Sequence, residues 1–225
     1  MIGYGVRLSV LALLLPGLAV AQARGSARRP PAAATRPRPK LVPAPSHFML
    51  AATGNQARFI VREHLMIMDA PNDAIGVTRA ISGGITLTAD GRIDPAASKI
   101  IVNLSTLTSD KENRDTWIKS HTLKTDSFPD AVFVPRQFAG IGGALPTSGT
   151  AAVKLVGDLT IHGVTRPVTW DVTLTAQGND YTGSASTHIK FEDFGMEQPR
   201  LMIVISVIDD VRLEYDFHFV KSAPK

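Results

Sequence analysis

The sequence contains no cysteine among its 225 residues. This absence excludes disulfide bonds, cysteine-ligated zinc, iron–sulfur clusters and thiol catalysis. Aromatic residues are also few, at 6%, and charged residues make up 20%. The apolar share of 44% is nevertheless high enough to bury a core, which argues against a wholly disordered chain.

Recognisable catalytic motifs are missing as well. The sequence has no Gly-x-Ser-x-Gly elbow and no Walker-type loop. The Glu63-His64 pair is not part of a His-Glu-x-x-His motif, and the six histidines show no ligand spacing. The adjacent carboxylates of Asp209-Asp210 and Glu192-Asp193 are typical of solvated turns. We therefore predict a protein that is not an enzyme and has no metal or cofactor.

Acidic residues are absent from residues 1–46, which hold seven basic residues. The remaining chain then has 17 basic and 20 acidic residues, a net charge of −3, although the whole chain carries +4. Basic residues are not interleaved with aromatic ones in a stacking platform. The charge distribution therefore predicts no binding to nucleic acid.

The first 21 residues have the three parts of a secretory signal peptide. Arg7 supplies the positive charge, a short leucine-rich run follows, and Pro16-Gly17 precedes the small residues around Ala21. Cleavage after Ala21 or after Ala23 fits the pattern. The apolar run is short for a membrane span. We therefore expect export to the periplasm.

Residues 22–46 contain six prolines, six basic residues and no hydrophobic period. Such a composition favours an extended, solvated linker. It is either a soluble spacer or a segment that contacts anionic membrane surfaces loosely through its basic side chains.

Residues 47–221 show the alternation of apolar and polar residues that is typical of strands. The clearest example is 211–219, where Val211, Leu213, Tyr215, Phe217 and Phe219 share one face. Other strands are expected at 58–65, 81–88, 99–104, 131–138, 153–161, 168–174, 181–189 and 201–208. With no βαβ alternation, this pattern predicts an all-β, mostly antiparallel barrel or sandwich.

One short helix interrupts the strands. Ser109-Asp-Lys-Glu112 has the form of a capping box, in which Ser109 and Glu112 would bond reciprocally to free amides. The helix would continue through Arg114, Trp117 and Ile118.

The interior of a closed barrel is either filled by side chains or open for a small ligand. Large inward residues alternate with small ones at Gly83, Gly157, Gly183 and Ala185, which either leave a cavity or mark bulges. The segment 201–208 is apolar on both faces, so either a partner subunit or loops of the same chain should cover it.

Residues 155–168 resemble the signature of the YceI-like family, Gly-Asp-Leu-Thr-hydrophobic-His-Gly-Val-Thr-Lys/Arg-Pro-Val. Residues 109–115, with Phe128-Pro129 and Val132-Phe133 after them, are similar to the family's Arg-Asp helix and following strand. Residues 191–195 are similar to its Asp-Phe-Gly turn. The three pieces occur in the family's order.

This resemblance implies an antiparallel, eight-stranded lipocalin-like β-barrel. Such a barrel would carry or sequester a long apolar lipid, a polyisoprenoid or fatty-acid derivative, in its lumen. It also implies a periplasmic and often dimeric protein. The expected ligand contacts are apolar side chains of the strands and the helix: Phe59, Val61, Ile85, Leu87, Leu104, Trp117, Ile118, Phe133, Leu155, Leu159, Trp170, Val172, Tyr215 and Phe217.

Two other functions remain open at this point: an envelope interaction module with a filled barrel, and an enzyme acting on an isoprenoid-type ligand. His162 would bond to neighbouring backbone at a hairpin end or contact a polar ligand head. Arg114 and Asp115 would either pair with each other or help to close one barrel end, which Trp117 and Ile118 would plug.

Overall fold

The computed structural model describes residues 45–140, 145–200 and 204–222. The predicted signal peptide and nearly all of the predicted linker lie outside these residues. Ten strands are present: β1 (Ser46–Leu50), β2 (Gln56–Leu65), β3 (Asn72–Thr78), β4 (Ile81–Leu87), β5 (Lys99–Asn103), β6 (Asp130–Ala139), β7 (Ser148–Ile161), β8 (Val164–Gln177), β9 (Asp180–Ile189) and β10 (Val204–Ser222).

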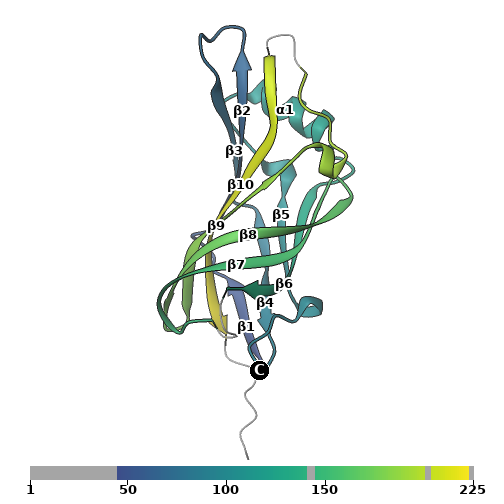
Figure 1. Cartoon of the computed structure of the whole chain (residues 1–225). Helices are drawn as coiled ribbons and strands as arrows, with labels where there is room; N and C mark the ends of the chain where they lie inside the picture. The colour runs from purple at the N-terminus through teal and green to yellow at the C-terminus, as the bar shows by residue number, and fades with distance from the viewer. Residues whose placement is uncertain (1–44, 141–144, 201–203, 223–225) are drawn as a thin grey trace, which may run out of the picture. The chain divides into compact units, whose positions relative to one another are not determined.

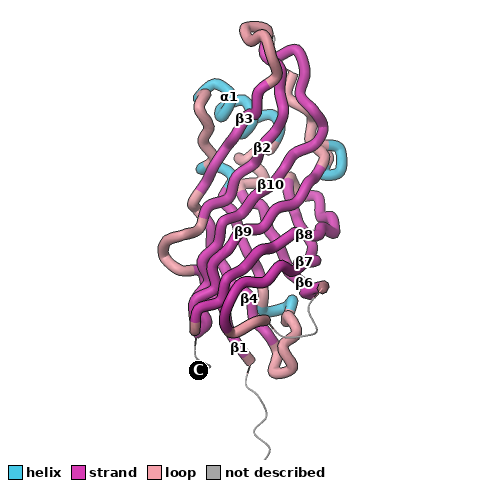
Figure 2. The backbone as a smooth tube through the Cα atoms, turned by 60° about the vertical axis from the view of Figure 1, so that its left-hand side comes forward, coloured by secondary structure: helices cyan, strands magenta, loops and turns pink. Residues whose placement is uncertain are grey.

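The strands form one antiparallel sheet that closes into a barrel (Figures 1 and 2). The closed part runs β1-β4-β5-β6-β7-β8-β9-β10, and β1 pairs again with the end of β10 through Leu50 and Phe219. This confirms the predicted eight-stranded barrel. Closure gives every barrel strand two neighbours, which leaves these strands few unpaired backbone groups.

β2 of the β2–β3 hairpin pairs with β10 between Val204 and Asp216. β9 pairs with β10 only from Val211 onward, so the start of this 19-residue strand extends past the end of β9 and pairs with β2. Between β1 and β2 the chain leaves the ladder, and Asn55 replaces the missing backbone bonds. Its side-chain NH₂ donates to the Ala51 carbonyl (2.8 Å), and its carbonyl oxygen accepts from the His218 amide (3.0 Å) and the Tyr215 hydroxyl (3.2 Å). One side chain therefore joins two consecutive strands to β10.

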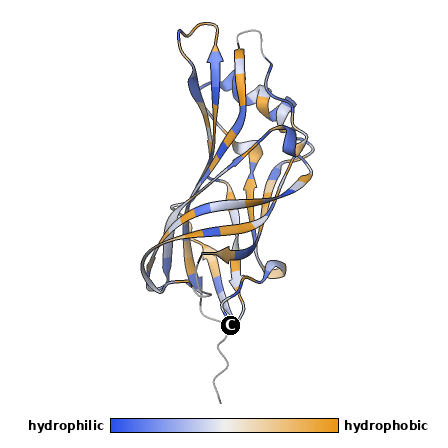
Figure 3. Ribbon diagram, viewed as in Figure 1, coloured by the Kyte–Doolittle hydropathy of each residue, from blue (hydrophilic) through white to orange (hydrophobic). Residues whose placement is uncertain are grey.

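Alternation of apolar and polar residues located most strands, as Figure 3 shows in the banding of the ribbon. Two strands were missed: β1, with five residues, and β3, which includes Gly76 and only a short apolar pattern. The two predicted strands at 201–208 and 211–219 are one strand, β10, with an irregular register against β2 between Val207 and Val211. Residues 201–203 of the first prediction lie outside the described residues.

The predicted helix is present as α1 (Glu112–Trp117), followed by a π-helical turn, η3 (Ile118–Thr122). The predicted capping box was wrong about which carboxylate bonds to Ser109. Lys111 occupies the N-cap, and Asp115 rather than Glu112 accepts from the Ser109 amide (2.8 Å) and hydroxyl (2.5 Å). Ser109 lies two residues too early for the N-cap, so the carboxylate one turn into the helix is the one that reaches it.

The inward glycines make room for aromatic rings. A Cβ on Gly157 would lie 2.6 Å from the Phe133 ring, and one on Gly183 would lie 2.8 Å from the Phe217 ring. Each ring therefore lies across a glycine of the neighbouring strand. Such a contact covers exposed backbone and holds the ring against the wall of the barrel.

The apolar segment at the start of β10 has exposed side chains in the described chain. Ile205 is 59% exposed and Ile208 is 53% exposed. No loop in the described part of the chain therefore covers these two side chains. Among the described residues, no helix is long and apolar enough to cross a membrane.

Candidate ligand-binding cavity

The barrel encloses a cavity of about 220 Å³. Its wall is apolar because the inward positions of the strands carry aliphatic and aromatic side chains, as in Val211, Leu213, Tyr215, Phe217 and Phe219 of β10. The lumen is therefore hollow rather than filled. An apolar cavity of this kind offers dispersion contacts and the removal of apolar surface from water, but few hydrogen bonds.

Most of the predicted ligand contacts lie together on this wall. Twelve of the fourteen line the cavity, and the two that do not are Leu87 and Trp117. Leu87 is buried in the core, at 5% exposed. Trp117 is stacked on His121, with ring centroids 4.7 Å apart. The adjacent Ile118 does line the cavity, because η3 turns it inward.

Several lining residues were missed by the sequence reasoning. Phe48 belongs to the unrecognised strand β1, and Leu107 and Leu123 belong to irregular segments. Phe191 and Met196 come from the turn around η4 (Glu192–Phe194). The two-residue alternation of inward and outward side chains applies to strands and does not hold in this turn. The sequence signal for Phe191 was its position in the Asp-Phe-Gly turn motif at residues 191–195.

Most polar side chains of the wall form hydrogen bonds with other groups of the protein. The Thr78 and Thr106 hydroxyls lie 2.6 Å apart, and Thr122 donates to the Glu197 carbonyl (3.3 Å). Burial of Tyr215 raises the pKa of its phenol, which keeps the hydroxyl neutral and able to donate to Asn55. These groups therefore add little free hydrogen-bonding capacity to the cavity.

The charged side chains of the wall are Arg58 and Glu214, which pair with each other across β2 and β10. The Arg58 guanidinium donates to Glu214 (2.6 Å) and to Asp216 (2.7 Å), and the hydrogen bond to Asp216, followed by that to Glu214, raises the pKa of Arg58. Its positive charge is therefore neutralised within the protein.

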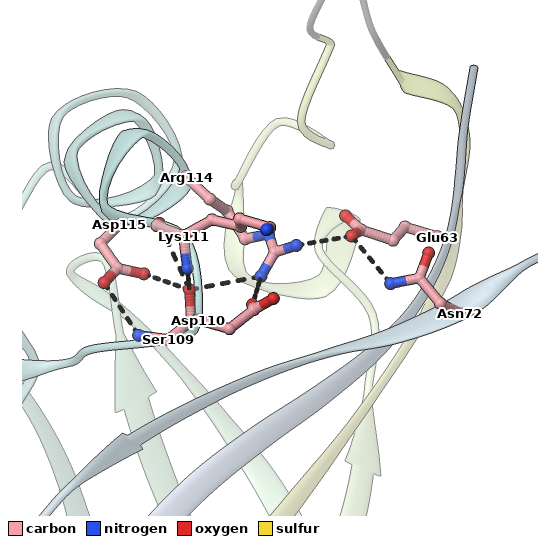
Figure 4. Close-up of polar contacts among 7 residues, drawn as sticks. All are labelled: Glu63, Asn72, Ser109, Asp110, Lys111, Arg114 and Asp115. Atoms are coloured by element: carbon pink, nitrogen blue, oxygen red, sulfur yellow. Dashed lines mark hydrogen bonds and ion pairs between the residues drawn. The ribbon is translucent and has the colours of Figure 1, made fainter. Parts of the chain in front are cut away.

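A buried polar cluster links α1 to the β2–β3 hairpin at one end of the cavity (Figure 4). Arg114 donates to Glu63 (2.7 Å), and their side chains are 10% and 6% exposed. Arg114 also donates to Asp110 (2.6 Å), and this hydrogen bond lowers the pKa of Asp110. Arg114 thus joins the hairpin instead of pairing with Asp115, which is bound to Ser109.

The position of this pair relates directly to the cavity. Glu63 is the next inward residue of β2 after Val61, which lines the cavity. Arg114 precedes Ile118 by four residues, about one helical turn. The ion pair therefore fixes the segment that carries Ile118 over one end of the lumen, and this fits the expectation that Arg114 helps to close a barrel end.

His162 lies in the two-residue turn between β7 and β8, with Gly163. Both residues have positive φ, 52° and 76°, as a tight hairpin turn requires. The His162 Nδ1 atom is 3.4 Å from the Phe194 carbonyl, and its ring meets Phe128 at 4.9 Å. His162 does not line the cavity. The structural interpretation of this residue is therefore supported.

Among the described residues, no group of three histidine, aspartate or glutamate side chains is placed to hold a metal ion.

Comparison with known proteins agrees with this geometry. The family model of the YceI-like domain matches residues 48–219, which include every strand from β2 to β9 and most of β1 and β10. The chain belongs to the YceI-like family. The resemblance first seen in residues 109–115, 155–168 and 191–195 is therefore confirmed.

Curated relatives and solved structures extend the comparison. The chain is 37% identical over 114 residues to a UPF0312 protein of Pseudomonas putida, and 31% identical over 112 residues to one of Yersinia enterocolitica. These matches cover 47% and 46% of this chain and 56% and 54% of the relatives, so the chain spans about half the length of the curated relatives it matches.

Two solved structures share the fold of this YceI-like chain. A polyisoprenoid-binding domain from Saccharophagus degradans, implicated in plant cell wall breakdown, has a TM-score of 0.62 at 13% identity and covers 78% of this chain and 98% of that domain. BcnA of Burkholderia cenocepacia has a TM-score of 0.53 at 18% identity and covers 75% and 96%.

Proposed function

We propose that this protein carries or sequesters a long apolar lipid, a polyisoprenoid or a fatty-acid derivative, inside its barrel. The observation that carries the proposal is the hollow, apolar lumen, whose wall brings together twelve of the residues expected to contact a ligand. The similarity in fold to a polyisoprenoid-binding domain supports the same conclusion.

Physical chemistry favours a slender ligand. The cavity of about 220 Å³ is smaller than the pockets of roughly 300–1,000 Å³ that hold drug-sized molecules. A linear hydrocarbon chain needs only a narrow channel, and each buried CH₂ group contributes about 0.8 kcal/mol. Binding rather than catalysis is the function that such a wall supports, because most of its polar side chains are already paired.

The test is a comparison of lipid retention in three proteins purified without detergent. Ala185 lines the cavity on β9, whereas its neighbour Ser184 is exposed. Ala185→Phe should fill the lumen, and Ser184→Phe places the same ring outside. Mass spectrometry of organic extracts should find near-stoichiometric lipid in the wild type and in Ser184→Phe and little in Ala185→Phe. Extracts of the wild type without a stoichiometric lipid would overturn the proposal.

The proposed site of action is the periplasm, reached through the signal peptide at residues 1–21. The composition of that segment supports export. Fractionation and N-terminal sequencing of the mature protein should place it in the periplasm, beginning after Ala21 or Ala23. A cytoplasmic protein that keeps residues 1–21 would overturn this proposal.

Two partners besides the lipid are proposed. The six basic residues of the linker would hold the protein loosely near anionic membranes. Exposed Ile205 and Ile208 would be covered by a second copy of the chain.

Each partner has its own measurement. Flotation with vesicles rich in phosphatidylglycerol should recover the mature chain but not a chain that begins at Pro45. Light scattering should give a dimer that Ile205→Lys converts to a monomer. Equal recovery of both chains, or a monomeric wild type, would refute the respective partner.

A further inference from the structure

Trp170 carries a hydrogen-bond donor that has no partner. It lies on β8 with the same inward alternation as Val172 and Leu174, and it lines the cavity. Its indole Nε1 is buried and makes no hydrogen bond. The described residues hold two other buried polar side-chain atoms without a partner, on Asn72 and His162, and neither residue lines the cavity.

An unpaired indole N–H is unusual because burying a donor without an acceptor costs free energy. The hydroxyls of Thr78, Thr122 and Tyr215 on the same wall all have protein partners. The neighbours of the Trp170 ring are apolar: Leu155 lies opposite on β7, and the Phe133 ring meets it edge-on at 5.9 Å. No described residue accepts from this donor, and a molecule in the lumen, which Trp170 lines, is the candidate acceptor.

We propose that the Trp170 N–H donates a hydrogen bond to an uncharged oxygen, such as a carbonyl, on the bound lipid. The proposed ligand is then an oxygenated lipid and not a plain hydrocarbon. The oxygen is uncharged because the one cationic side chain on the wall among the described residues, Arg58, is neutralised by Glu214 and Asp216. A buried anion beside Trp170 would lack a counter-charge.

The ring reaches the ligand by a small movement. The torsion about the Cβ–Cγ bond of an aromatic side chain has a broad minimum, so the indole plane turns at little cost. Trp170 borders the empty space, and the proposal requires that such a turn bring its N–H to a ligand oxygen. This inference rests on the proposed function, since it needs a lipid in the lumen.

The experiment compares two probes that differ in one oxygen. Delipidated protein is titrated with farnesylacetone, a polyprenyl ketone, and with the matching hydrocarbon in which two hydrogens replace the oxygen. Trp170→Phe should weaken ketone binding about two- to tenfold more than hydrocarbon binding, the range expected for one net hydrogen bond. Trp117→Phe is the matched control, because Trp117 is outside the lining, and it should leave both affinities unchanged.

A second measurement separates the N–H from the volume of the ring. The chain has two tryptophans, so its nitrogen–proton spectrum holds two indole signals. In the Trp117→Phe background the remaining Trp170 signal should move downfield with the ketone and stay in place with the hydrocarbon. Benzothienylalanine at position 170, which keeps the bicyclic shape and lacks the N–H, should lose the preference for the ketone.

The outcomes separate the two proposals. If the wild type binds both probes and Trp170→Phe weakens them equally, the hydrogen bond is refuted and the carrier function stands. If the wild type binds neither probe, both proposals fail.

Discussion

Removal of the buried carboxylate of Glu63 is expected to destabilise the barrel strongly. Its partner Arg114 lies 2.7 Å away, and both side chains are at most 10% exposed. Glu63→Ala leaves the guanidinium buried with the Ser109 hydroxyl and one charged partner, Asp110, whose side chain is 68% exposed. Breaking one side of a buried ion pair costs about 3–5 kcal/mol. Because Asp110 still compensates Arg114 in part, we expect about 3 kcal/mol.

The assay is urea-induced unfolding of delipidated protein, followed by tryptophan fluorescence. In a parallel thermal melt, a loss of about 3 kcal/mol corresponds to a fall in melting temperature of roughly 6–12 °C for a domain of this size. Asp110→Ala is the matched control, since it removes the exposed partner of the same Arg114. An exposed pair contributes about 0–1 kcal/mol, so this variant should unfold close to the wild type.

A double substitution tests whether the loss of stability comes from leaving the Arg114 charge without its buried partner. Glu63→Leu combined with Arg114→Met removes both charges and leaves apolar side chains in their place. Such replacements of buried pairs are often neutral, so the double variant should recover most of the stability lost in Glu63→Ala. If Glu63→Ala unfolds at the same urea concentration as the wild type, or if the double variant is no better than Glu63→Ala, the account of this cluster is wrong.

Three further predictions concern the strands. Gly83→Ala should cost several kcal/mol in urea unfolding, because φ is +114° and the new Cβ would lie 1.9 Å from the Lys99 carbonyl oxygen; wild-type stability would refute this. Asn55→Ala should cost about 1–3 kcal/mol, since it leaves the His218 amide without its acceptor, and an unchanged melting temperature would contradict the role given to Asn55. The raised pKa of Tyr215 means that the folded state holds the phenol proton more tightly than the unfolded chain. The contribution of the Tyr215 phenol to the free energy of unfolding is therefore fully present below about pH 10, and it is lost as the pH rises beyond that value. Tyr215→Phe should show a smaller fall between pH 9 and pH 11 in thermal melts, and an equal fall would count against the prediction.

Sequence alternation alone located the inward faces of most strands, because each strand of a barrel buries one face and exposes the other. Thus the alternation predicts Trp170 and Phe217 on the inner side of the barrel, where the structure places them. The short helix was found from its polar start, although Asp115 rather than Glu112 completes it. Local patterns of this kind depend on neighbours in the chain, which a sequence displays directly.

Only the tertiary structure decided that the lumen is hollow. Small inward residues such as Gly157 and Gly183 are compatible with a filled or an open barrel, and the outcome depends on where the Phe133 and Phe217 rings lie. The pairing of Arg114 with Glu63, 51 residues away in sequence, was also beyond local pattern. Both features are set by contacts between distant strands, and neither the alternation along one strand nor the absence of cysteine carries information about them.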